Sequence, residues 1–323
     1  MQEQTTGKEI QISILVPVYN EQAVVPQLAE RLAALMTSRQ EVMEVIFIND
    51  GSTDNTSLQL FSICLSDSRF QCISFSRNFG HQIALTAGLH YARAKEAVFI
   101  IDGDLQDPPE LFEVFYEKFQ MGYEVVYGIR NLRKESGIKR FFYFGFYRII
   151  GKLSTLHFPF DSGDFSLISR NVVTVMNQFP EESRFLRGIR SWVGFKQIGV
   201  AYERNARIAG SSKYSYFRLI RLAMNGIYNF SELPIRFISL AGFFSVLLAL
   251  VYFVATLVSK FVYHTVPAGF TALLFAIILF SGVQLLSLGV IGEYVLRIFF
   301  QGKNRPLFII DKKVFDKQIS DGQ

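Results

Sequence analysis

Residues 97–104 read AVFIIDGD, an apolar run that ends on two aspartates separated by one glycine. Strand side chains alternate with period two, so Asp102 and Asp104 are predicted to point the same way. Two carboxylates suit Mg²⁺ or Mn²⁺, which prefers hard oxygen ligands and neutralises the charge of a leaving diphosphate. An isolated Asp-x-Asp is also common in turns. Its position at the end of a buried strand favours the metal site, with Gln106 as a supporting ligand.

The N-terminal two thirds of the chain repeats this pattern of short apolar runs. The runs, several rich in β-branched residues, lie at 12–18, 42–48, 72–75, 97–101 and 124–127, and helical patterns lie at about 21–36, 54–65, 81–94 and 109–121. Such alternation predicts βαβ units and a mainly parallel sheet buried on both faces. We therefore expect a Rossmann-like α/β domain over residues 11–230, preceded by a polar tail at 1–10.

Polar clusters follow four of the predicted strands. They are residues 19–21 (YNE), 49–52 (NDGS), 76–78 (SRN) and 102–104 (DGD). Ligands of such sheets bind outside the carboxyl ends of the strands, so the clusters are predicted to form one site. Asp50 has two compatible interpretations: its segment forms a turn in which Ser52 or Asp54 caps the next helix, and its carboxylate accepts hydrogen bonds from a ribose or a base.

Two long uncharged stretches follow Pro234, at 237–259 and 268–291. Each exceeds the roughly 20 apolar residues that a helix needs to cross a bilayer. They predict a transmembrane hairpin within 231–296, with spans at about 236–260 and 267–292. The alternative, a pair of buried core helices, usually involves shorter helices with a polar stripe.

Flanking charge gives the orientation of this hairpin. Arg218, Arg221 and Arg236 precede it, and Arg297 and Lys303 follow it. Positive residues stay cytoplasmic, so the domain at 11–230 and a tail at 297–323 are both expected in the cytosol. The polar first residues are not a signal peptide. The net charge of +5 fits a protein that lies against anionic lipids.

Residues 130–156 combine basic side chains with a dense aromatic series at 141–147. This composition is typical of an amphipathic helix in the membrane interface, and a second such segment covers 214–229. A solvated basic face over core aromatics is the alternative. Cys64 and Cys72 show no metal or redox spacing, so both are expected to pack in the core of a protein in a reducing compartment.

Three motifs together resemble the family 2 glycosyltransferases of GT-A fold: residues 16–21 (VPVYNE), 49–54 (NDGSTD) and 102–110 (DGDLQDPPE). Within that family the chain is similar to the polyprenyl-phosphate glycosyltransferases, which include dolichol-phosphate mannose synthases and bactoprenol glucosyltransferases. Residues 77–80 (RNFG) and 163–170 (GDFSLISR) resemble the bactoprenol glucosyl branch. Gly103 departs from the family pattern, which has Ala or Val there.

The resemblance implies roles for individual residues. The nucleoside would be held by Pro17, Tyr19, Glu21 and Asp50, with Asp102 near the ribose and the metal. Asp104 would ligate the metal beside Gln106, and Asp164 matches a position proposed as catalytic, as a modest base or an orienting group. The phosphates would be covered by a segment that contains Arg204, Arg207, Ser212 and Lys213.

A phosphate monoester acceptor has a second pKa near 6, so it needs little help from a general base. Positioning and electrostatics are therefore expected to dominate. Bidentate arginine contacts suit the delivery of a lipid phosphate, and we assign this task to Arg130, Arg133, Lys139 and Arg140. A single displacement at the anomeric carbon inverts its configuration.

The expected activity is that of a metal-dependent hexosyltransferase in the bacterial inner membrane. It would move glucose from UDP-glucose onto undecaprenyl phosphate at the cytoplasmic face, without a nucleic-acid partner and with homo-oligomers possible. GDP-mannose, UDP-N-acetylglucosamine and UDP-aminoarabinose remain alternative donors. A non-catalytic membrane partner with a degenerate transferase domain is a further alternative.

Two other classes fit the sequence less well. A processive polysaccharide synthase carries a Gln-x-x-Arg-Trp motif, whereas residues 190–192 read RSW without the matching glutamine. A dinucleotide-dependent oxidoreductase would need a Gly-x-Gly-x-x-Gly after the first strand, which is missing from the sequence.

Overall fold

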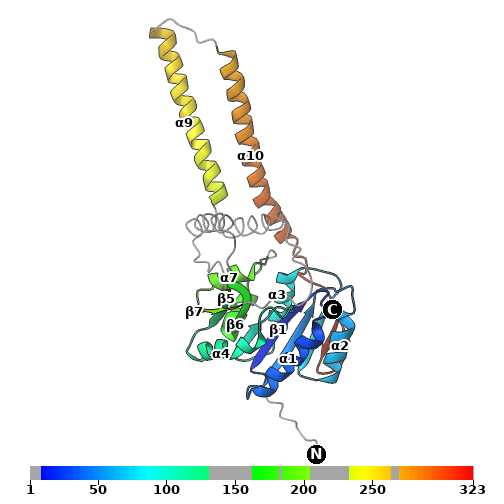
Figure 1. The fold of residues 1–323 in the computed structure, drawn as a ribbon. Helices are drawn as coiled ribbons and strands as arrows, with labels where there is room; N and C mark the ends of the chain where they lie inside the picture. The colour runs from blue at the N-terminus through cyan, green and yellow to red at the C-terminus, as the bar shows by residue number, and fades with distance from the viewer. Residues whose placement is uncertain (1–8, 131–161, 182–183, 204–232, 263–268, 323) are drawn as a thin grey trace, which may run out of the picture. The chain divides into compact units, whose positions relative to one another are not determined.

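The computed structural model describes residues 9–130, 162–181, 184–203, 233–262 and 269–322 (Figure 1). The chain divides into two compact units. Of the described residues, 9–130, 162–181, 184–203 and 306–322 belong to the first unit, and 233–262 and 269–305 belong to the second. The chain thus leaves the first unit, forms the second, and returns to the first.

In its described residues, the first unit is built on a nine-stranded sheet of order β7-β5-β6-β4-β1-β2-β3-β8-β9. The central strands β3, β2, β1 and β4 run parallel, as the sequence predicts. They cover Ile12–Val18 (β1), Met43–Asn49 (β2), Phe70–Phe75 (β3) and Ala97–Ile100 (β4). All of their residues are buried, as expected for strands covered on both faces.

Antiparallel strands flank the parallel centre and make the sheet mixed. On one side β6 (Ser162–Ser169) pairs with β4 and with β5 (Val125–Arg130), and β7 (Gln197–Tyr202) runs parallel to β5. On the other side β8 (Ile310–Phe315) pairs with β3 and β9 (Gln318–Asp321) pairs with β8. The sequence predicts β5 but not β6, β7, β8 or β9.

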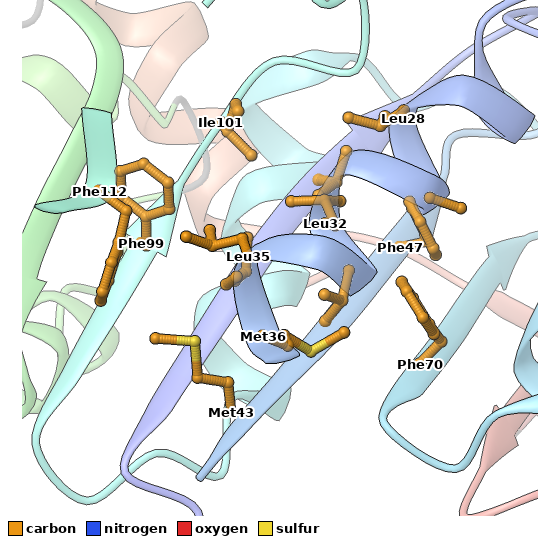
Figure 2. Packing of buried hydrophobic residues seen from close by; sticks show 14 of the residues in the cluster. Leu28, Leu32, Leu35, Met36, Met43, Phe47, Phe70, Phe99, Ile101 and Phe112 are labelled. Carbon is orange, nitrogen blue, oxygen red and sulfur yellow. The ribbon is translucent and has the colours of Figure 1, made fainter. Parts of the chain in front are cut away.

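Helices cover both faces of the sheet. The apolar faces of α1 (Val25–Ser38), α2 (Thr56–Ser66) and α4 (Phe112–Gln120) contribute to one core cluster, which Figure 2 shows around Leu32, Phe47 and Phe99. A second cluster contains side chains of α3 (His81–Tyr91), α6 (Arg170–Asn177) and α7 (Leu186–Trp192). A short 3₁₀ turn, η1 (Pro109–Leu111), precedes α4. Burial on both faces fixes the sheet in the middle layer.

The second unit contains two long helices, α9 (Leu233–Val262) and α10 (Phe270–Gly302). Within them, Leu240–Val262 and Leu279–Gly302 are long and apolar enough to cross a membrane by length and composition. Core helices of soluble proteins pass the same test, but none of the described residues in the apolar 18-residue window of either helix is buried inside the protein. Helix α10 continues past residue 292, where the predicted second span ends.

Candidate active site

The predicted polar clusters meet at one edge of the sheet, where the parallel strands β1 to β4 end. Val18, Asn49, Phe75 and Ile100 are their last residues. The antiparallel strand β6 begins at the same edge, because Ser166 lies opposite Ile100. This register brings Asp164, two residues before Ser166, to the edge that also carries the loop from Asp102.

The loop that follows β4 is held by one contact within the loop and one to the distant strand β7. The backbone N–H of Gln106 donates to Asp104 Oδ1 over 3.1 Å, and the carboxylate of Asp107 accepts a hydrogen bond from the hydroxyl of Tyr202. Leu105 has a φ of 56°, a left-handed conformation that costs a branched residue roughly 1–3 kcal/mol. Its side chain is almost completely buried, which keeps the strained turn in place.

Gly103 lets this loop lie directly against β1. A Cβ atom added at Gly103 would lie 2.7 Å from Val18 Cγ1 and 2.8 Å from the carbonyl oxygen of Pro17. Real Cβ atoms essentially never approach a backbone oxygen so closely. The departure from the family pattern at this position therefore matches a close approach of the two segments, and Pro17 takes part through its backbone.

The carboxylate of Asp164 is buried and strongly hydrogen-bonded. Arg187 donates through Nε to Oδ1 (2.8 Å) and through Nη2 to Oδ2 (2.9 Å), and Gln82 donates to Oδ2 over 3.1 Å. His81 Nε2 lies 3.2 Å from the same oxygen. Burial alone would raise the pKa of Asp164, but Arg187 and His81 outweigh it and hold the pKa well below its ordinary value. Asp164 is therefore an anion at neutral pH.

His81 lies between two carboxylates. Its Nε2 is 3.2 Å from Asp164 and 3.7 Å from Asp102 Oδ1. Burial opposes protonation of His81, yet the hydrogen bond to Asp164 and the charge of Asp102 raise its pKa. Burial raises the pKa of Asp102, an effect that the neighbouring His81 opposes. The imidazole thus connects the loop after β4 to the Asp164–Arg187 pair.

A second arginine, which is buried, reinforces the positive charge beside Asp164. Arg190 follows Arg187 by three residues on α7, so the two lie on one side of the helix. Arg190 Nη2 donates to the carbonyl oxygen of Gly163 (3.3 Å), and its guanidinium lies over the ring of Tyr127. Burial lowers the pKa of Arg190 to about 10, which leaves it charged at neutral pH.

Asp50 organises the neighbouring loop. Its carboxylate accepts hydrogen bonds from the backbone N–H of Phe79 (2.7 Å) and of Gly80 (3.0 Å), at the start of α3. Burial raises the pKa of Asp50, although these N–H groups oppose the shift. Gly51, at a φ of 66°, lies so close to Arg77 that a Cβ atom would be 2.3 Å from the Arg77 carbonyl carbon. The structural role of Asp50 is thus visible, and its predicted contact with a nucleoside stays a prediction.

A cavity of about 460 Å³ opens beside these loops. Its lining is polar and comes from the ends of β1, β2 and β3 and from β8: Tyr19, Asn49, Gly51, Ser52, Thr53, Ser57, Ser74, Phe75, Ser76, Arg77, Asn78 and Asp311. A second cavity, of about 290 Å³, lies at the opposite edge, near Lys95 and Arg170. Because ligands of such sheets bind at the carboxyl ends of the strands, the first cavity is the candidate ligand site.

The residues around Asp102 and Asp104 fit a magnesium or manganese ion. Among the described residues, no group of three or more His, Cys, Asp or Glu side chains could hold a metal by itself. Mg²⁺ is usually held by one or two carboxylates together with substrate phosphates and water, so two aspartates suffice. Gln106 belongs to the same loop, and its backbone fixes Asp104.

The structure unites only part of the predicted site. Tyr19 lines the cavity, Asp102 lies near Asp164, and Glu21 lies before α1, where its backbone N–H donates to Thr56 Oγ1. The side chain of Arg130 is not described, and seven other predicted residues lie outside the described residues: Arg133, Lys139, Arg140, Arg204, Arg207, Ser212 and Lys213. Their roles stay predictions, as do the interfacial helices at 130–156 and 214–229.

Sequence reasoning missed His81, Gln82 and Arg187, which surround Asp164. Their contacts join residues 82–83 and 23 positions apart, which no local pattern reveals. Only weak sequence signals pointed to these three residues. His81 and Gln82 directly follow the RNFG motif at 77–80, and Arg187 precedes Arg190 at helical spacing.

Residues 13–175 match the sequence profile described as glycosyl transferase family 2. The glycosyltransferase YkcC of Bacillus subtilis is 44% identical over 307 residues, which cover 95% of this chain and 95% of that protein. The bactoprenol glucosyl transferase of Shigella phage SfII is 38% identical over 304 residues, which cover 94% of this chain and 98% of that protein. With the mixed sheet and the carboxylates at its edge, these similarities show that the chain belongs to glycosyl transferase family 2.

Proposed function

We propose that this protein transfers a sugar from a nucleotide donor to a polyprenyl phosphate. The observation that carries the proposal is the placement of Asp102, His81 and Asp164 next to one another at the carboxyl edge of the sheet. A polar cavity of nucleotide size opens at the same edge. The similarity to a bactoprenol glucosyl transferase over almost the whole chain supports glucose as the sugar and a bactoprenol-type lipid as the acceptor.

The donor would lie along the strand ends. We assign the diphosphate to the Asp102–Asp104 loop, where a bound Mg²⁺ or Mn²⁺ would stabilise the charge of the departing nucleotide. The nucleoside would occupy the cavity near Tyr19 and Arg77. UDP-glucose is the proposed donor, with GDP-mannose, UDP-N-acetylglucosamine and UDP-aminoarabinose as alternatives.

Asp164 would act as a positioning group. A carboxylate that accepts hydrogen bonds from Arg187 and Gln82, with a pKa well below the ordinary range, is a poor base at neutral pH. The acceptor phosphate is already largely anionic and needs no strong base. We therefore assign Asp164 the task of fixing His81 and Arg187, which in turn present positive charge to the reacting phosphates. Direct displacement would invert the anomeric carbon.

The two apolar helices would anchor the protein in the inner membrane of a bacterium, with the sheet domain and both termini in the cytosol. Their length and composition support insertion, and the basic residues on both sides of the pair support this orientation. The lipid phosphate would then reach the site from the cytoplasmic leaflet. A homo-oligomer is compatible with this arrangement.

The test is the transfer of radiolabelled glucose from UDP-glucose to undecaprenyl phosphate by the purified full chain. We expect labelled lipid in the presence of Mg²⁺, and a loss of at least about 100-fold with a chelator or with Asp104→Ala, since a metal contributes several kcal/mol. Asp67→Ala, at the opposite edge of the sheet, is the control and should keep full activity. A wild-type protein that binds UDP but labels no lipid with any of the four donors would support the non-catalytic alternative.

A further inference from the structure

We propose that Asp311, on the strand that forms after the apolar hairpin, recognises the nucleobase of the sugar donor through an N–H group on the base edge. The inference rests on the proposed function, because it assumes that the 460 Å³ cavity binds a nucleotide. Neither the sequence motifs nor the comparisons assign a role to this part of the chain. The C-terminal residues would thereby take part in recognition of the donor.

The register of β8 brings Asp311 to the cavity. Strand β8 runs antiparallel to β3, with Lys312 opposite Ser74 and Ile310 opposite Phe75. Two steps along β8 thus match one step along β3, so Asp311 is the extra residue of a β-bulge. Bulges occur next to active sites, where they redirect a side chain. Ser74 and Phe75 line the same cavity as Asp311.

The position of Asp311 along the sheet indicates that it meets the base of the donor rather than the diphosphate. Four strand-to-strand steps separate β4, which precedes the Asp102–Asp104 loop, from β8. At about 4.8 Å per step, this is roughly 19 Å. A donor whose diphosphate binds at Asp104 therefore extends its nucleoside over β1, β2 and β3, toward Asp311. A carboxylate beside the diphosphate would repel it unless a metal ion lay between them, whereas a carboxylate at the far end of the donor can accept a hydrogen bond from the base.

Among the described lining residues of the cavity, Asp311 is the acidic one. The residue is exposed, so its carboxylate is accessible to a ligand. The carboxylate of Asp50, by contrast, belongs to a residue that is only 4% exposed, and it already accepts the N–H groups of Phe79 and Gly80. On the hydrogen-bonding edge of uracil the N3–H group is the donor, and Asp311 offers the matching acceptor.

The strand that carries Asp311 is firmly attached. Ser76 N–H donates to the carbonyl oxygen of Ile309 (3.0 Å), and the rings of Phe308 and Phe75 stack with centroids 5.3 Å apart. Farther along, Arg93 forms an ion pair with Asp316 (2.8 Å). Because these contacts do not involve the Asp311 side chain, its replacement is expected to leave the fold intact.

The experiment is titration calorimetry of the full chain in detergent with UDP and Mg²⁺. We expect Asp311→Ala to weaken UDP binding about tenfold, or about 1.4 kcal/mol, and Asp311→Asn, which keeps one acceptor oxygen, to recover part of the affinity. Asp321→Ala removes another exposed carboxylate, on β9, that does not line the cavity, and this variant should bind UDP as the wild type does.

A second probe, UDP methylated at N3 of the base, tests the assigned partner. The methyl group should weaken binding to the wild type and add no further loss in Asp311→Ala. Unchanged or tighter UDP binding by Asp311→Ala would overturn the inference and leave the proposed function intact. A wild type that binds none of UDP, GDP and CDP would overturn the proposed function itself.

Discussion

The Asp164→Asn substitution places a neutral amide where Arg187 now meets a buried carboxylate. Asp164 is 4% exposed and Arg187 is 35% exposed, so the change removes a buried negative charge that lies beside a half-buried guanidinium. Breaking a buried pair by removing one partner costs about 3–5 kcal/mol, and the partial access of Arg187 to water favours the lower end, about 3 kcal/mol. One nitrogen of the new amide would also face the donor groups of Arg187 or Gln82.

Thermal unfolding of the full chain in detergent, followed by tryptophan fluorescence, measures this cost. Trp192 is the only tryptophan of the chain and is the last residue of α7, the helix that carries Arg187. A loss of about 3 kcal/mol corresponds to a decrease in Tm of roughly 6–12 °C for a domain of this size. The signal therefore comes from the element that the substitution disturbs.

The Arg31–Glu110 pair provides a matched control. Arg31 donates to both oxygens of Glu110, over 3.0 and 2.6 Å, as Arg187 does to Asp164, but the side chain of Glu110 is 61% exposed. Exposed pairs contribute about 0–1 kcal/mol, so Glu110→Gln should lower Tm by no more than about 4 °C. Equal decreases for Asp164→Asn and Glu110→Gln would refute the argument that burial sets the cost.

Two further predictions concern the same edge of the sheet. Gly51→Ala should lower Tm, because the φ of 66° disfavours any side chain and the new Cβ would overlap the Arg77 backbone. Gly122→Ala, also at positive φ but with open space around it, should lower Tm less. Equal decreases in Tm would contradict the role of the contact with Arg77. The Asp164–Arg187 pair should also lose its effect in acid. Since the pKa of folded Asp164 lies well below its ordinary 3.8, its stabilisation is fully present above about pH 4 and is lost as the pH falls through the folded pKa. The Tm difference between the wild type and Asp164→Asn should accordingly shrink in acid, and a constant difference would argue against the ion pair.

The central fold was predictable because buried parallel strands read as continuous apolar runs. Strands β1 to β5 and the helices between them lie where the runs and helical patterns place them, within a few residues. Strands β8 and β9 were not predicted from apolar runs. Strand β8 has the sequence IDKKVF, whose charged residues give no apolar run, and charge of this kind is typical of the edge of a sheet.

The residues of the candidate site were also predictable only in part. The cluster of polar residues after each parallel strand was predictable from the rule that such strands end at a common edge. The partners of Asp164 were not predictable, because strand β6, helix α3 and helix α7 bring Asp164, His81 and Arg187 together from distant parts of the chain. Asp311 was hidden for the same reason, since β8 reaches the edge only after the hairpin.

The return of the chain to β3 also constrains the hairpin. The described residues before position 204 and after position 305 belong to one folded unit, and β8 is hydrogen-bonded to β3 within it. Both ends of the second unit must therefore lie on the same side of any membrane that this unit crosses, so the number of crossings is even. Two crossings, one by each apolar helix, would satisfy this condition, and the basic residues on both sides of the pair agree with it. A strand that closes the sheet after the hairpin thus allows residues on both sides of the hairpin to line one cavity.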